Sequence, residues 1–337
     1  MNEVTVRGYT FNSILGEGTF GKVGSAYSTC LRTRVAIKVI NKRKLTPNYR
    51  ENFLARELEI IRSLDHPNIV KTLDIFESRT SKVYVVMEFC EKGDLLKHIT
   101  VNGALPEHSV CRLFTQLCNG VQYLHNRDVA HRDLKCENIL LDINLHLKVC
   151  DFGFSKRLTY ADGRMMLSET FCGTSSYASP EILKGFPYNP KVSDVWSMGV
   201  VLYMMLLASM PYDSTNIKKM LDSQIKHIVI FPNIPSISSE VKALIQSILH
   251  PVVGQRITIN NILQTSWMLQ EKSRFPTQVH FPYNKHVGHC SPIRPLSISL
   301  KIVPDVLLES KRHHVSLKYS LPGEESGSGC HLPGPQC

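Results

Sequence analysis

The most informative stretch of this sequence is His131-Arg132-Asp133-Leu134-Lys135-Cys136-Glu137-Asn138, followed by Asp151-Phe152-Gly153. Asp133 is a carboxylate that can orient an attacking hydroxyl and accept its proton. Asn138 and Asp151 are oxygen ligands of the kind that hold a divalent cation against phosphates. The complete spacing is far more specific than any one of these residues, and it predicts phosphoryl transfer.

A second group of residues is expected to serve the same reaction. Lys135 lies between the base and the amide, where an ammonium can neutralise charge on the moving phosphoryl group, and it favours serine or threonine as the target. Thr174, from a later loop, is expected to bridge Asp133 and Lys135, although threonines in loops also commonly cap turns.

Three glycines near the amino terminus, Gly16, Gly18 and Gly21, precede Val23. Such triplets also occur in dinucleotide-binding folds, where they open a helix, and in tight turns. A P-loop would need a hydroxyl where Val23 stands, followed by a helix. Because these glycines lie between two predicted strands, we expect a hairpin whose backbone amides approach phosphates.

Lys38 ends the apolar strand Val35-Ala36-Ile37-Lys38, so its ammonium needs a partner. Glu57 shares the inward helical face with Leu54 and is the expected partner, and the pair would hold Lys38 against the α- and β-phosphates. Glu59 is the alternative, but it lies on another side of the same helix.

The periodicity of the chain predicts an α+β fold with two parts. The first part is a five-stranded antiparallel sheet with one main helix over residues 50–64. The second is larger and mostly helical. Its predicted helices cover residues 95–100, 110–124, 192–208, 217–226, 239–249 and 258–265.

Composition indicates a globular protein, and ten cysteines without regular spacing, together with an amino terminus that lacks an apolar signal segment, predict an intracellular one. The chain has 337 residues, 43% of them hydrophobic, and a formal charge of +10, which suits a basic enzyme attracted to ATP and acidic partners. No aromatic-basic RNA motif or paired Cys-x-x-Cys is present, so no specific nucleic acid is expected. The most apolar stretch, residues 196–210, is too short to span a bilayer.

Residues 10–268 resemble a eukaryotic protein kinase. Besides the motifs above, Ser179-Pro180-Glu181 resembles the family's Ala-Pro-Glu, and residues 194–199 resemble the start of its anchoring helix. The resemblance implies a bilobal protein-kinase fold with an N-lobe at 10–88, a hinge at 88–92 and a C-lobe at 93–268. Arg256 would pair with Glu181. Residues 1–9 would be an N-terminal extension and 269–337 a mostly disordered tail.

The resemblance implies ATP and Mg²⁺ as cofactors and protein substrates as partners. Glu88 and Cys90 would bind adenine through their backbone, and Met87 would control access behind it. Leu15, Val23, Ala36 and Leu140 would line the adenine pocket.

More narrowly, Arg132-Asp133-Leu134-Lys135-Cys136-Glu137-Asn138 and Ser168-Glu169-Thr170-Phe171-Cys172-Gly173-Thr174 look like the testis-specific serine/threonine kinases of the calmodulin-dependent kinase group. That resemblance implies a role in spermatogenesis, cytoplasmic residence and chaperone dependence. Asp94 and Glu137 occupy positions that, in related kinases, read a basic residue upstream of the target, although each is also compatible with a solvated surface charge.

Arg132 has no evident substrate role, so a phosphorylated loop residue is its expected partner. Thr170 is the predicted switch and an upstream activating kinase its predicted modifier. Ser168 and Thr174 compete with it, and a loop that is ordered without phosphate is the remaining alternative.

Two other classes of function stay open. A pseudokinase would keep the fold without transfer, but Lys38, Asp133, Asn138 and Asp151 are all present. Nucleic-acid binding through the basic tail is the second. In that tail, residues 298–308 form an apolar island that could dock on the helical lobe, and His286, His289 and Cys290 form an incomplete metal-ligand set.

Overall fold

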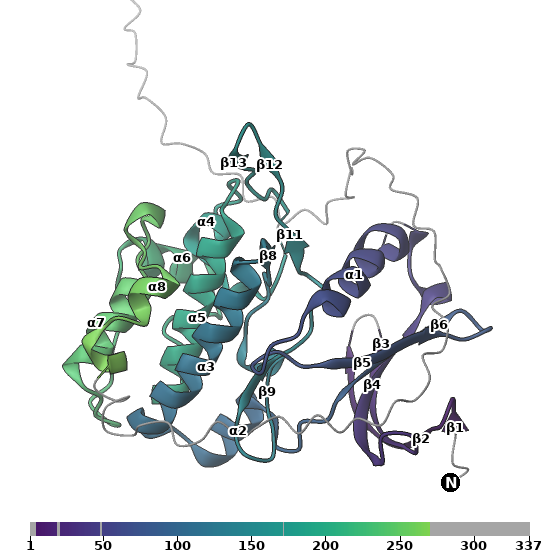
Figure 1. The fold of residues 1–337 in the computed structure, drawn as a ribbon. Helices are drawn as coiled ribbons and strands as arrows, with labels where there is room; N and C mark the ends of the chain where they lie inside the picture. The colour runs from purple at the N-terminus through teal and green to yellow at the C-terminus, as the bar shows by residue number, and fades with distance from the viewer. Residues whose placement is uncertain (1–4, 19–20, 48, 171, 270–337) are drawn as a thin grey trace, which may run out of the picture. The chain divides into compact units, whose positions relative to one another are not determined.

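The computed structural model describes residues 5–18, 21–47, 49–170 and 172–269. The predicted tail and its apolar and His-Cys segments therefore lie outside the described residues, apart from Leu269. One antiparallel sheet has the strand order β1-β2-β3-β4-β6-β5 (Figure 1). Its strands are Thr5–Val6 (β1), Tyr9–Gly18 (β2), Gly21–Ser28 (β3), Thr33–Asn41 (β4), Thr72–Glu77 (β5) and Lys82–Glu88 (β6).

The five long strands are those that the sequence predicts. The sixth, β1, lies in the segment assigned to an N-terminal extension and pairs with the start of β2. Two residues are too few to show an alternating pattern, so the sequence gives no signal for this strand. The register between β3 and β4 places Val23 opposite Lys38 and therefore brings the glycine hairpin next to the strand that carries the lysine.

The predicted helix over residues 50–64 is present with a change of geometry along its length. Tyr49–Leu54 forms a π-helical segment and Ala55–Ser63 forms α1. Glu57, Ile60 and Ile61 are the buried residues of α1. The one acidic side chain on this buried face is Glu57, as the helical periodicity predicts.

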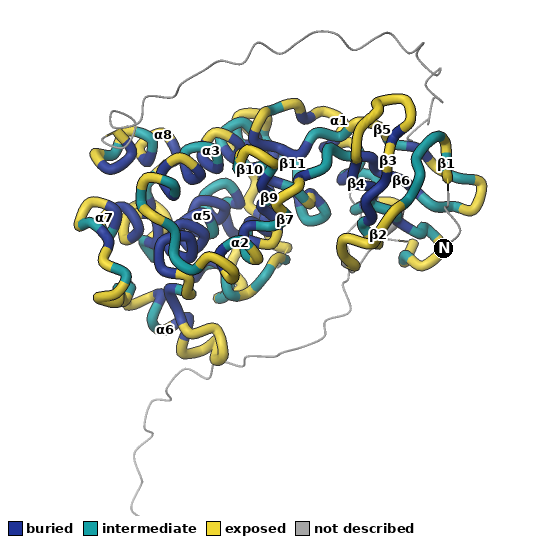
Figure 2. The backbone as a smooth tube through the Cα atoms, turned by 90° about the horizontal axis from the view of Figure 1, so that it is seen from below, coloured by how far each residue is buried: buried dark blue, intermediate teal, exposed yellow. Residues whose placement is uncertain are grey.

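The remaining described chain is mostly helical. Its helices are Leu95–Asn102 (α2), Glu107–His125 (α3), Pro180–Leu183 (α4), Pro190–Leu207 (α5), Ile217–Ile225 (α6), Ser239–Ile248 (α7) and Ile259–Ile262 (α8). Figure 2 shows α5 almost entirely in the buried colour, which agrees with its apolar sequence on all sides. The sequence overestimates α8, which Thr258 caps and which ends four residues later.

Short strands hold the loops that carry the predicted chemistry. Gly93–Asp94 (β7), Ile139–Leu141 (β9) and Leu147–Val149 (β10) form a small antiparallel sheet. Val129–Ala130 (β8) pairs with Lys156–Arg157 (β11), and Tyr160–Ala161 (β12) pairs with Arg164–Met165 (β13). The segments before Asp133 and after Asp151 are therefore fixed to each other by backbone hydrogen bonds.

Candidate active site

A buried carboxylate holds the loop that contains Asp133 through hydrogen bonds to its backbone. Asp194 of α5 accepts the backbone N–H of His131 at 2.9 Å and that of Arg132 at 2.8 Å, and it is 1% exposed. The ring of His131 packs on Phe152 with centroids 5.2 Å apart. Charge-assisted bonds to two consecutive amides hold the loop rigidly on the core helix.

Asp133 lies in a network of four polar groups. Its Oδ1 accepts both the backbone N–H and the hydroxyl of Thr174 at 3.0 Å. Its Oδ2 lies 3.0 Å from the ammonium of Lys135 and accepts the side-chain amide of Asn138, also at 3.0 Å. Lys135 donates in turn to the Thr174 hydroxyl at 2.8 Å. The predicted contacts of Thr174 with Asp133 and Lys135 are thus both present.

Lys38 meets two carboxylates. Its ammonium lies 2.7 Å from Glu57 Oε1 and 3.0 Å from Asp151 Oδ1. Burial disfavours the charged lysine, but these two carboxylates outweigh it and the pKa of Lys38 is raised. Burial likewise opposes the charge of Asp151, yet the nearby ammonium lowers its pKa. The alternative partner, Glu59, instead binds Arg157 at 3.0 Å.

Asn138 and Asp151 fit the requirements of a divalent cation. In the described structure the hydrogen bonds of the Asn138 side chain are both made by Nδ2, to the carbonyl and the carboxylate of Asp133, which leaves the amide oxygen for a cation. The Asp151 side chain is half exposed, and its Oδ1 contacts Lys38. Carboxylate and amide oxygens are ligands that Mg²⁺ takes together with substrate phosphates and water.

The residues predicted to line an adenine pocket come from strands that pair with one another. Val23 in β3 faces Lys38 in β4, and Ala36 in β4 faces Met87 in β6. Leu140 in β9 belongs to the small sheet of β7, β9 and β10, where it pairs with Lys148 and with Asp94. Leu15 is 49% exposed in the described structure.

Arg132 contacts Ser168, and the described residues show no hydrogen bond between its side chain and Thr170. Its Nε donates to the carbonyl of Phe154 at 2.7 Å, and its Nη1 donates to the Ser168 hydroxyl at 3.2 Å. Thr170 has an exposed side chain, and its carbonyl accepts the hydroxyl of Tyr188 at 3.1 Å. The buried guanidinium therefore has neutral hydrogen-bond partners among the described residues, and one of them is the serine that competed with Thr170 in the sequence.

The two acidic residues predicted to read substrate lie on adjoining segments. Asp94 caps α2 by accepting the backbone N–H of Lys97 at 2.8 Å. Glu137 is exposed and accepts the Tyr177 hydroxyl at 3.4 Å. The 3-10 turn Cys136–Asn138 packs against β7 and α2, so both carboxylates belong to the same region of the fold.

Glu181 and Arg256 form the predicted buried pair. The guanidinium binds both carboxylate oxygens, at 2.7 and 3.0 Å, and its side chain is fully buried. Burial opposes the charge of Glu181, but the bidentate guanidinium lowers its pKa. Ser179 is buried and accommodates its hydroxyl beside that of Ser193, 3.2 Å away. A serine is therefore satisfied at this packed position.

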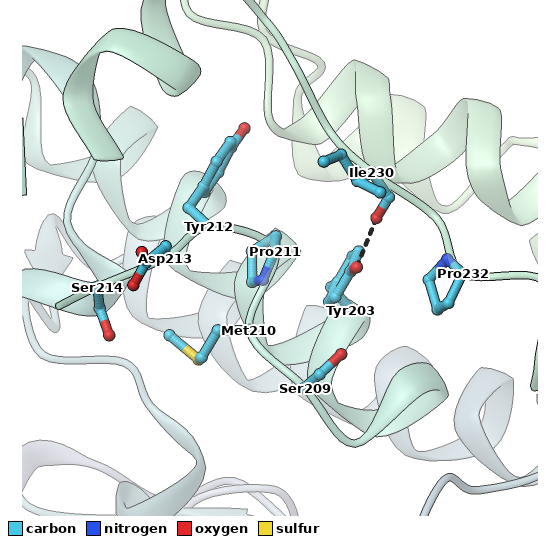
Figure 3. A pocket seen from close by; sticks show the side chains of 9 residues that line it. All are labelled: Tyr203, Ser209, Met210, Pro211, Tyr212, Asp213, Ser214, Ile230 and Pro232. Atoms are coloured by element: carbon cyan, nitrogen blue, oxygen red, sulfur yellow. Dashed lines mark hydrogen bonds between the residues drawn. The ribbon is translucent and has the colours of Figure 1, made fainter. Parts of the chain in front are cut away.

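A separate pocket of about 530 Å³ lies at the end of α5. Figure 3 shows Tyr203 in it, with its hydroxyl donating to the carbonyl of Ile230 at 2.6 Å. None of the residues that line this pocket belongs to the predicted site. Its lining residues are Tyr203, Ser209, Met210, Pro211, Tyr212, Asp213, Ser214, Ile230 and Pro232.

The fold agrees with what comparison with known proteins shows. Residues 9–268 match the protein kinase domain family, and the chain belongs to that family. The members of this family use ATP and a divalent metal ion, generally Mg²⁺. Every helix in the described part of the chain is too short or too polar to cross a membrane.

Within this family the chain belongs with the testis-specific serine/threonine kinases. It is 50% identical to mouse testis-specific serine/threonine-protein kinase 1 over 80% of this chain and 73% of the relative. Identity to mouse testis-specific serine/threonine-protein kinase 2 is 47%, over 82% and 77%. Identity to the mouse kinase 3 of this group is 45%, over 77% of this chain and 96% of the relative. The chain is thus a serine/threonine protein kinase by homology.

Proposed function

We infer that this chain transfers the γ-phosphoryl group of ATP to serine and threonine hydroxyls of proteins with the residues described above. The observation that carries the proposal is the network that joins Asp133, Lys135 and Asn138, together with the Lys38 contact to Glu57 and Asp151. A pseudokinase would have no need to keep all of these contacts.

Each residue has a role in the proposed reaction. Asp133 orients the incoming hydroxyl and accepts its proton, while Lys135 stabilises negative charge on the transferred group. Lys38, held by Glu57, grips the α- and β-phosphates. Asn138 and Asp151 would hold Mg²⁺, which neutralises phosphate charge when bound.

The nucleotide would lie against the paired strands. Glu88 and Cys90 would bind adenine through backbone groups, and Met87 would limit access behind the ring. Leu15, Val23, Ala36 and Leu140 would enclose it, and the backbone of the Gly16, Gly18 and Gly21 hairpin would approach the phosphates.

We also propose a preference for a basic residue upstream of the target hydroxyl. The supporting observation is that Asp94 and Glu137 lie in adjoining segments and that Glu137 is exposed. A positional peptide library tests this, with Asp94→Asn and Glu137→Gln as variants. Wild type should select arginine and the variants should lose that selection, whereas a flat wild-type profile rejects the preference.

Regulation by phosphate on Thr170, supplied by an upstream kinase, is proposed because Arg132 is buried against neutral partners. Thr170→Ala should then lose most activity, and Ser168→Ala serves as the comparison. Equal turnover of purified wild type and Thr170→Ala rejects the switch.

The cellular setting is proposed from the names of the relatives and from the resemblance of the sequence. The testis-specific names of the relatives support a role in spermatogenesis. Residence in the cytoplasm and dependence on a chaperone are proposed from the family resemblance of the sequence alone. Expression confined to other tissues would contradict this setting.

The enzymatic proposal is tested by incubating purified protein with Mg²⁺, ATP and a generic protein substrate, and by mapping phosphosites with mass spectrometry. New phosphoserine or phosphothreonine with wild type is the expected result. Failure to modify any substrate, with ATP bound, would favour the pseudokinase.

A further inference from the structure

A carboxylate at the end of β6 receives three hydrogen bonds from two other segments. Glu88 accepts the ammonium of Lys148 at 3.0 and 2.8 Å through its two oxygens, and it accepts the backbone N–H of Lys71 at 2.7 Å. The side chains of Lys148 and Glu88 are 14% and 27% exposed. Sequence reasoning assigns only the backbone of Glu88 a role and gives Lys148 none.

The partners of Glu88 lie on segments that surround the proposed nucleotide site. Lys71 precedes β5, and its carbonyl accepts the backbone N–H of Glu88 at 3.0 Å, so the connection between these two residues is double. Lys148 lies in β10, where it pairs with Leu140, a proposed adenine contact. Asp151 lies two residues after the end of β10.

The side chain of Glu88 thus connects the hinge with β10, in the small sheet of β7, β9 and β10. A second connection runs beside it, because the backbones of Val70 and Val149 are hydrogen-bonded at 2.9 Å. That backbone connection restrains β10 against the segment before β5, whereas among the described residues it is the Glu88 carboxylate that joins the first hinge residue to β10. The far end of the hinge is held separately, because the backbone N–H of Lys92 donates to the carbonyl of Leu141 in β9 at 3.1 Å. The carboxylate is therefore placed to set the hinge backbone.

We propose that Glu88 and Lys148 are a positioning pair that holds the hinge backbone in the conformation that binds adenine. This inference rests on the proposed function, because it assumes that adenine binds at Glu88 and Cys90. Without the pair, binding must order the hinge at the expense of affinity. The groups that act on the phosphoryl group, Asp133 and Lys135, are held by other contacts and should work unchanged.

If the Glu88–Lys148 pair only stabilised the fold, its loss would have a different effect from the loss of a positioning pair. Loss of one partner from this partly buried ion pair should lower the melting temperature, and a purely structural role would do so without a selective effect on nucleotide. A positioning role predicts a change in KM for ATP that exceeds the change in kcat and that a conservative substitution reverses.

The test compares Lys148→Met, Glu88→Gln and the double variant in steady-state kinetics with ATP varied. Glu88→Gln keeps an acceptor for the Lys71 amide. We expect KM for ATP to rise about fivefold in each single variant, with kcat changed by less than about twofold. KM for ATP in the double variant should be no higher than in the single variants, because each single substitution already removes the same interaction. Lys148→Arg should restore most of the affinity.

The matched control is Lys42→Met. Lys42 makes a similar two-oxygen contact with Glu77, at 2.9 and 3.0 Å, at another edge of the same sheet. Its loss should leave KM for ATP unchanged. Melting temperatures of all variants show whether any has lost its fold. If Lys148→Met has lost its fold, Lys148→Arg keeps the test valid.

Two outcomes overturn the inference. One is an unchanged KM for ATP in Lys148→Met, and the other is a strictly additive double variant. Absence of transfer by the wild type would instead contradict the proposed function, so the two failures are distinguishable.

Discussion

The ammonium of Lys38 lies 2.7 Å from Glu57 Oε1, and this contact joins β4 of the sheet to the buried face of α1. The same ammonium reaches Asp151, which follows β10. One lysine therefore connects three segments that are distant in sequence, and its position depends on both carboxylates.

Glu57→Gln should lower kcat/KM about a hundredfold, because the phosphate-binding ammonium loses the charge that orients it. Glu59→Gln is the matched control, since Glu59 lies on the same helix but binds Arg157. Steady-state kinetics with ATP varied measure both. Similar values for Glu57→Gln and Glu59→Gln would contradict the assigned role of Glu57.

Thr174→Val should reduce kcat about tenfold, the size expected for loss of a hydrogen bond to a charged group. The hydroxyl of Thr174 bonds both Asp133 and Lys135, and valine keeps the shape without these bonds. Thr174→Ser should keep most of the rate because it retains the hydroxyl. If serine and valine behave alike, the hydroxyl is not what matters.

Gly173→Ala should impair activity although it adds only one methyl group. Gly173 has a φ of +97°, and a Cβ there would lie 2.5 Å from the carbonyl oxygen of Arg132. Strain of about 1–3 kcal/mol would displace Thr174 from Asp133. Gly163→Ala is the control, since its φ is also positive but no atom lies within 4 Å. A kinetic assay in which Gly163→Ala loses as much as Gly173→Ala would argue against this.

Glu181→Gln should destabilise the fold by about 3 kcal/mol at neutral pH, because Arg256 stays buried without its counter-charge. The pKa of Glu181 is lowered in the folded state, so the unfolded chain binds the proton more readily. The wild-type advantage is therefore full above the ordinary pKa of 4.5 and declines as pH falls through the lower folded value.

Urea unfolding of wild type and Glu181→Gln across this pH range measures that decline. If the stability difference between wild type and Glu181→Gln grew as the pH fell, its sign would be opposite to the prediction, and another titrating group would control the pH dependence.

Much of the fold follows from periodicity. The alternating and apolar runs predict the five long strands, and the helical spacing places Glu57 rather than Glu59 on the inward face. The strand β1 is too short to give a pattern. The end of α8 depends on tertiary packing that single-sequence propensity does not describe.

The contacts of the candidate site are predictable to different degrees. Those of Lys38 and Thr174 follow from spacing within recognisable motifs. The pairing of Glu88 with Lys148 does not, because it depends on how β6 lies against β10, which no local pattern specifies. The contact of Arg132 with Ser168 likewise depends on the path of a loop, and sequence distinguishes Ser168 from Thr170 poorly.

The central claim is that Asp133 handles the proton of the attacking hydroxyl while other residues hold the nucleotide. Its most direct measurement is transfer of radiolabelled γ-phosphate from ATP by wild type and by Asp133→Asn, with nucleotide affinity measured in parallel. We predict that Asp133→Asn binds ATP with Mg²⁺ as wild type does but transfers phosphate at least about a hundredfold more slowly. Transfer by Asp133→Asn at the wild-type rate would contradict the account.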